Sequence, residues 1–169
     1  MRPNQSEYAP FYESYVSLVH EEDLNEALHS SLEEIRDMLE NIPIEKADHA
    51  YAEGKWTVKE LLQHIIDAER VFSYRAVSIA RGEQQSLPSF DENSYAKLAD
   101  VSQRSLREMK EELLTLRSSV YLMFKGFNES MLKNIGTASE KKISVNALGY
   151  ISVGHIRHHF NILRERYLD

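Results

Sequence analysis

The sequence predicts an all-α protein, a four-helix bundle with long connecting loops. Apolar residues recur every three or four positions in four separate segments, which is the spacing of amphipathic helices. No segment alternates apolar and polar residues in the way that predicts a β-strand. A chain of 169 residues can bury one sizeable core, so we expect residues 1–169 to form a single domain.

The first helix is expected from about Ser17 to Glu40. Its apolar side chains form one stripe, at Leu24, Leu28, Leu32, Ile35 and Leu39. Pro43 ends the helix, because proline lacks the backbone N–H that a continuing helix needs.

The second and third helices are marked by their boundary residues. The sequence "TVKE" forms a capping box: the Thr57 hydroxyl accepts from the Glu60 amide, and the Glu60 carboxylate reaches back. Gly82 ends this second helix. A loop containing Pro88 follows, and the third helix is expected from about Ser102 to Phe124.

The fourth helix follows a segment with few helical features. Residues 126–142, "GFNESMLKNIGTASEKK", are expected to form an irregular connector with glycines near both ends. Ser144 is a suitable N-cap, and the helix that it begins is expected to continue to about Tyr167.

Composition excludes several classes of function. The net charge is −7 and no basic run of five residues occurs, which argues against a nucleic-acid partner. The absence of cysteine excludes disulfides, thiolate metal sites and a cysteine nucleophile. No apolar run approaches the 18 or so residues of a membrane span, and the first residues lack a signal-peptide core. We therefore expect a cytoplasmic protein that has no membrane partner.

Three histidines cluster near the C-terminus, in the sequence "GHIRHHF". His155 and His159 are four residues apart, which puts them on one helix face with Cβ atoms about 5–6 Å apart. Two neutral imidazoles at that spacing can share one metal ion. His159 has Ile156 and Ile162 as face neighbours, whereas His158 leans toward solvent, so we favour the pair of His155 and His159.

A third histidine lies on the second predicted helix. His64 is one turn from Leu61 and from Ala68, both on the apolar stripe, so its ring is expected to point inward. If the second and fourth helices are neighbours, three imidazoles converge and leave a coordination position open, as catalytic sites do. The spacing alone also fits histidines that are simply hydrogen-bonded in the core.

Three carboxylates are candidates for catalytic roles beside this site. Glu60 and Asp67 lie about one turn to either side of His64, where either can orient the imidazole or transfer protons. Asp91, with Glu92, lies in the "FDE" loop and is a candidate acid or base. The alternative is that Glu92 only caps a local turn.

Three segments together resemble a known family. They are "KWTVKELLQHIIDAERVF", "LPSFDENSYA" and "GHIRHHFNILRERYL", in that order, within a similarity from about Asn41 to Leu168. The chain resembles the DinB-like superfamily of DNA-damage-inducible, metal-binding four-helix proteins. The resemblance implies an up-up-down-down-type bundle that holds one divalent metal ion, nickel or zinc. Matched by position, its ligands fall on His64, His155 and His159.

The resemblance also implies an activity. It suggests a metal-dependent hydrolase or a low-molecular-weight thiol S-transferase, in which the ion activates water or a thiolate against a small-molecule substrate. The substrate class includes thiols, and a homodimer is compatible with the family. The alternatives are a non-catalytic bundle that binds a metal or small ligand, and a plain bundle in which the histidines only pack.

Overall fold

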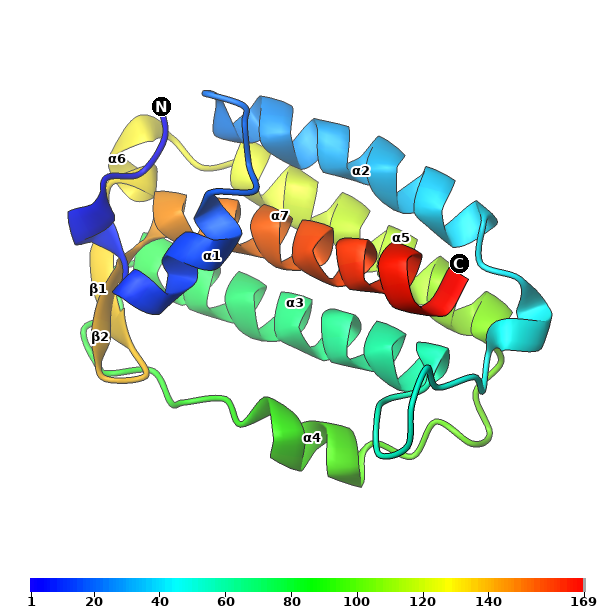
Figure 1. Cartoon of the computed structure of the whole chain (residues 1–169). Coiled ribbons are helices and arrows are strands. Elements are labelled where there is room, and N and C mark those ends of the chain that lie inside the picture. Colours follow the sequence, from blue (N-terminus) through cyan, green and yellow to red (C-terminus); the bar gives the residue numbers. More distant parts are fainter. Residues whose placement is uncertain (169) are drawn as a thin grey trace.

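The computed structural model, which describes residues 1–168, is a four-helix bundle (Figure 1). Its long helices are α2 (Leu24–Glu40), α3 (Val58–Ala80), α5 (Leu106–Lys125) and α7 (Val145–Ile162). A final turn, η4 (Leu163–Leu168), continues α7. None of the described helices combines the length and the apolar character that crossing a bilayer requires.

The four long helices form a ring in the order α2, α5, α3, α7, in which each helix packs chiefly against the two beside it. Gln63 of α3 contacts Arg104 just before α5, and Arg70 contacts Glu112 further along both helices, so these neighbours are parallel. Figure 1 shows that α2 and α7 are also parallel. In contrast, α3 and α7 are antiparallel, since His64 meets His159 while Glu69 meets Ser152. The directions in chain order are up, down, down, up, so the up-up-down-down order is wrong.

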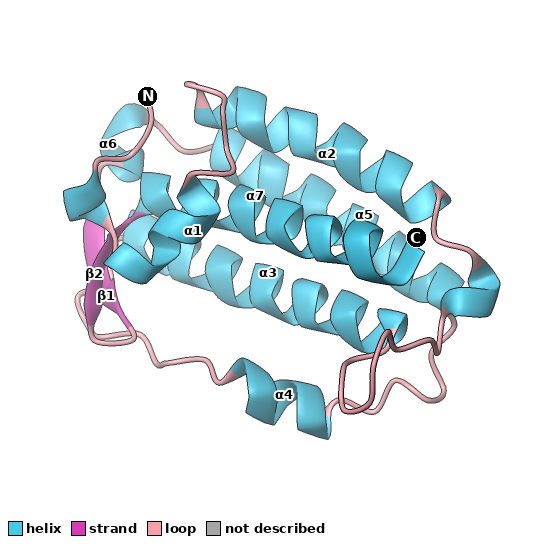
Figure 2. Cartoon of the chain, in the orientation of Figure 1, coloured by secondary structure: helices cyan, strands magenta, loops and turns pink. Residues whose placement is uncertain are grey.

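Short elements fill the connections and the N-terminal segment (Figure 2). They are η1 (Gln5–Glu7), η2 (Pro10–Tyr12), α1 (Glu13–Val16), η3 (Ile44–Lys46), α4 (Glu92–Leu98), α6 (Glu129–Leu132), β1 (Ile135–Ala138) and β2 (Lys141–Ser144). The crossover that carries α4 runs along the outside of the bundle (Figure 1). It is long because α3 and α5 are parallel, so the chain must return along the length of the bundle.

The irregular connector expected over residues 126–142 is wrong in its second half. There β1 and β2 pair antiparallel, with Ile135 opposite Ser144. Ser139 and Glu140 turn the chain at φ values of 51° and 61°, a left-handed conformation that usually selects glycine or asparagine. Neither residue type is present there, and four-residue strands are too short to show clear alternation.

The helix boundaries depend on side-chain caps. The capping box at Thr57 is confirmed, with its hydroxyl 3.2 Å from the Glu60 nitrogen, and Ser144 caps α7 as expected. The first predicted helix begins later than Ser17, at Leu24, because the Asp23 carboxylate accepts from the Glu26 amide at 3.0 Å. The third begins at Leu106, after the Ser105 cap, rather than at Ser102.

One buried polar network joins all four long helices. The Arg117 guanidinium of α5 is fully buried and donates to the Glu69 carboxylate of α3 at 2.6 Å. It also donates to the hydroxyl of Ser31 on α2 at 2.7 Å and to that of Ser152 on α7. The Ser152 hydroxyl donates in turn to Glu69 at 2.8 Å. The buried charges are therefore paired and hydrogen-bonded, as a low-dielectric core requires.

Removing the carboxylate from this network should destabilise the fold. We expect Glu69→Ala to lower the free energy of unfolding by about 3–5 kcal/mol, because it leaves the Arg117 charge buried without its partner. Chemical denaturation measures the loss. The matched control is Glu129→Ala, which breaks an ion pair whose acid is 83% exposed and should therefore cost far less stability. Equal losses in the two variants would contradict the prediction.

Candidate metal centre

Two antiparallel helices bring the three predicted histidines together. His64 lies in α3, and His155 and His159 lie one turn apart on the face of α7 that packs against it. All three side chains are buried, with 4%, 4% and 8% of their surface exposed. Among the described residues they form the one group of histidine and carboxylate side chains with metal-ligand spacing.

The three Nε2 atoms form a nearly regular triangle. His64 Nε2 lies 3.1 Å from His155 Nε2 and 3.0 Å from His159 Nε2, and the last two atoms are 3.1 Å apart. Ligand nitrogens about 2.0–2.1 Å from one tetrahedral ion would lie roughly 3.3 Å from one another. The observed separations therefore suit a shared ion.

Hydrogen bonding alone does not satisfy this triangle. A nitrogen of a neutral imidazole is either a donor or an acceptor. Any assignment of three such atoms therefore leaves two of the same kind facing each other at about 3 Å. A cation that accepts all three lone pairs removes this conflict. The donor set fits a divalent metal ion.

The surroundings keep the three rings neutral. Burial, together with the nearby His158, lowers the pKa of His64 to about 4. Burial, with the charges of His64 and His158, lowers the pKa of His159 to about 2. The pKa of His155 is lowered well below its usual value, again chiefly by burial. At neutral pH no proton competes with a metal ion for these nitrogens.

Aromatic rings from four parts of the chain enclose the histidines. The Trp56 ring is 4.9 Å from that of His64, and Phe90 stacks on the same imidazole at 6.5 Å. Phe72 of α3 and Tyr15 of α1 lie edge-on to His155, at 5.5 Å and 5.3 Å. This wall limits the access of water and strengthens electrostatic interactions inside it.

The position of Tyr15 could not be derived from its own segment. It depends on Gly154 of α7, where an added Cβ would overlap the Tyr15 carbonyl oxygen. Only glycine lets α1 lie this close to α7, beside His155. The signal in the sequence was a glycine directly before the histidine cluster. His158 is half-buried and packs against Tyr15 at 5.4 Å, outside the triangle of Nε2 atoms.

The three candidate catalytic carboxylates have other partners. Glu60 Oε2 accepts from the Thr57 amide at 2.7 Å, and Asp67 Oδ1 accepts from the Gln63 side chain at 2.9 Å. In the described part of the chain neither is hydrogen-bonded to His64. Burial raises the pKa of Asp67.

The two acids of the "FDE" loop, Asp91 and Glu92, take different positions at the start of α4. Asp91 is exposed and caps α4 by accepting from two amides at 3.1 Å, so the alternative that Glu92 forms this cap is wrong. Burial is the main cause of a raised pKa at Tyr15, and the negative charge of Glu92 adds to it. The catalytic roles of Glu60, Asp67 and Asp91 stay predictions.

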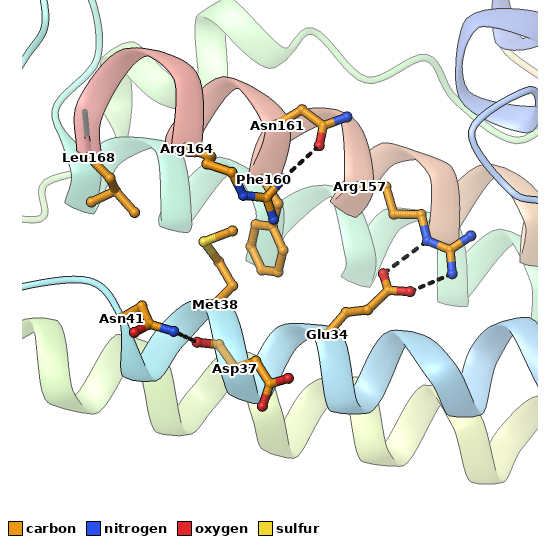
Figure 3. A pocket seen from close by; sticks show the side chains of 9 residues that line it. All are labelled: Glu34, Asp37, Met38, Asn41, Arg157, Phe160, Asn161, Arg164 and Leu168. Atoms are coloured by element: carbon orange, nitrogen blue, oxygen red, sulfur yellow. Dashed lines mark hydrogen bonds and ion pairs between the residues drawn. The ribbon is translucent and has the colours of Figure 1, made fainter.

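A separate groove lies between α2 and α7, with a volume of about 430 Å³ (Figure 3). Arg157 lies at one end, where it donates to Glu34 at 2.6 and 2.9 Å and to Glu21 at 2.7 and 2.9 Å. None of the three clustered histidines lines this groove. It is therefore distinct from the candidate metal centre, and Arg157 fastens the segment before α2 to the bundle.

Comparison with known proteins agrees with this arrangement. Residues 27–163 match the family model described as the DinB superfamily. No protein of curated function matches the chain.

A solved structure shows the same fold. It is YfiT from Bacillus subtilis, described as a probable metal-dependent hydrolase with an unusual four-helix bundle topology. The two superpose with a TM-score of 0.73 over 98% of this chain and 90% of that chain, at 16% sequence identity.

Metal content tests the triangle of histidines. We expect tag-free protein dialysed against zinc or nickel to retain about one ion, because three neutral nitrogens converge on one point. His64→Ala should weaken binding by more than the 10–100-fold typical of losing an outer-shell partner. His158→Ala is the matched control and should retain the metal. Equal metal content in both variants, measured by inductively coupled plasma mass spectrometry, would exclude the site.

The ion pair at Arg157 should make stability depend on pH. Hydrogen bonds from Arg157 lower the pKa of Glu21 from 4.5 to about 2. A lowered carboxyl pKa stabilises the fold above the unfolded value and loses that effect as pH falls through the folded value. Glu21→Gln should therefore cost about 1–2 kcal/mol at pH 7.

The difference between Glu21→Gln and the unaltered chain should shrink as the pH falls from about 5 to about 2. Urea denaturation at several pH values measures it. Glu33→Gln, in an ion pair whose acid is 61% exposed, should show a much smaller difference at every pH. A cost for Glu21→Gln that does not change with pH would refute the assignment.

Proposed function

The chain belongs to the DinB superfamily, and from this membership and its histidine triangle we propose that it is a metal-dependent hydrolase of a small molecule. The observation that carries the proposal is the convergence of three buried Nε2 atoms within 3.0–3.1 Å of one another. Structural zinc sites usually have four protein ligands, whereas three ligands leave a position for water or substrate.

A divalent ion bound by His64, His155 and His159 would polarise a substrate oxygen and lower the pKa of water. The protein supplies the remaining requirements. Its neutral imidazoles would hold the ion without adding negative charge, which would preserve the ion's Lewis acidity. The rings of Trp56 and Phe90 restrict the approach of solvent.

Proton transfer would need a further group. Of the three predicted carboxylates, Asp91 is occupied as a helix cap and Glu60 closes a capping box. Asp67 is the strongest candidate, since it caps no helix and burial raises its pKa. It lies one turn from His64 on α3.

The decisive experiment is a turnover screen with metal-loaded protein. The panel contains 4-nitrophenyl esters, anilides and lactones, and pairs of small thiols with electrophiles. We expect hydrolysis that requires zinc or nickel and stops on chelation. His155→Ala should lower the rate by about two orders of magnitude or more, because Lewis-acid stabilisation is worth several kcal/mol. His158→Ala should retain most of the activity.

Other outcomes of the screen identify the alternatives. Turnover only in the presence of a thiol would replace hydrolysis by thiol S-transfer at the same site. Bound metal without turnover of any substrate would favour a non-catalytic binding bundle. Hydrolysis that survives both chelation and His155→Ala would refute the proposal.

A further inference from the structure

A hollow of about 270 Å³ adjoins the candidate metal centre. Five aromatic or aliphatic residues contribute to its lining, namely Tyr51, Trp56, Leu61, Ile162 and Tyr167. The ligand histidine His159 and the polar or small residues Gly54, Lys55 and Asn93 complete it. The hollow therefore reaches the candidate metal centre through one of its proposed ligands.

The aromatic part of this lining is held in place. The Tyr167 hydroxyl donates to the Trp56 carbonyl oxygen at 2.8 Å, and the Tyr167 side chain is buried. The ring of Tyr51 stands edge-on to that of Tyr167, with centroids 4.9 Å apart. Because these contacts fix the rings before anything binds, an incoming flat group would lose little through ordering of the protein.

Trp56 connects the hollow with the histidine triangle. Its indole lines the hollow and also packs against His64, with ring centroids 4.9 Å apart. A molecule in the hollow would therefore touch one ligand histidine and the indole that supports another. This places its end beside the position where the ion would act.

The volume of the hollow and the charge of its lining limit which molecules can bind there. An apolar cavity of about 150 Å³ holds one benzene ring, so a hollow of about 270 Å³ suits one ring with a substituent. Aromatic rings attract one another edge-to-face or offset-stacked at about 4.5–7 Å. Among residues 1–168, which the structure describes, Lys55 is the charged residue in the lining and no carboxylate belongs to it.

We propose that the hollow beside His159 binds a single aromatic ring of the substrate, adjacent to the bond that is cleaved. The inference deepens the proposed function, on which it rests, because it takes the metal centre as the place of reaction. It assigns the substrate to the small aromatic esters or amides.

A second hollow provides a matched control. It also measures about 270 Å³ and is lined by Tyr74, Phe90 and Tyr95, but by none of the three clustered histidines. Tyr74 is 56% exposed and Tyr51 is 38% exposed, so truncating either ring should leave the fold intact. The two tyrosines differ in which hollow they line.

The test is a fluorescence titration of the full chain with benzamide, with and without zinc. Trp56 is the single tryptophan, so its emission reports on this hollow. We expect a saturable change in emission. The affinity for benzamide should be about two- to tenfold weaker in Tyr51→Ala than in the unaltered chain, as loss of one aromatic contact predicts. Tyr51→Phe and Tyr74→Ala should bind benzamide as the unaltered chain does. Cyclohexanecarboxamide should bind more weakly than benzamide.

Three results would overturn the inference. They are the absence of a saturable change, equal weakening by Tyr74→Ala and Tyr51→Ala, and equal affinity for the saturated ring. Since the titration needs no turnover, failure here would leave metal-dependent hydrolysis intact. Saturable binding of benzamide without hydrolysis of any substrate would instead support the hollow and count against the proposed function.

Discussion

The register of α3 against α7 is the constraint on which the candidate site depends. The hydrogen bond between Ser152 and Glu69 joins these helices. Along each helix it lies about one turn from the nearest of the three histidines. Because the helices are antiparallel, fixing Glu69 opposite Ser152 also fixes His64 opposite His155 and His159. A slip by one turn would shift the rings by about 5.4 Å, enough to separate His64 from the other two. Arg117 fastens the same pair to α5 and α2, so the register is a property of the whole bundle.

Two kinds of buried polar group therefore lie close together, a pair that stays charged and a cluster that stays neutral. The Arg117–Glu69 pair stays charged, and its cost of desolvation is offset by hydrogen bonds to two serines. The imidazoles one turn away have no such partners, and burial keeps them neutral by lowering their pKa values. The paired charges thus set the geometry, while the unpaired nitrogens keep the lone pairs that a metal ion needs.

The sequence predicts the parts that depend on local repeats. The apolar stripes located the four long helices, and the inward face of each histidine followed from its neighbours one turn away, such as Leu61 for His64. The missed features depend on other information. Periodicity does not encode helix direction, so the up-down-down-up order became clear only from contacts between helices. The β1–β2 turn uses Ser139 and Glu140 in a conformation that their residue types rarely adopt. The contact of α1 with α7 needs Gly154, which is distant in the sequence from Tyr15.

The division between helices and connections bears on how such a site acquires its specificity. The histidines lie on helices whose register is fixed by a buried network, so their positions cannot change without cost to the core. The walls around them come largely from other segments: α1 supplies Tyr15, the residues before α3 supply Tyr51 and Trp56, and the crossover supplies Phe90. Connections tolerate substitution and insertion far better than packed helices do. A bundle of this kind can therefore keep one arrangement of ligands while the connections determine which molecule reaches it.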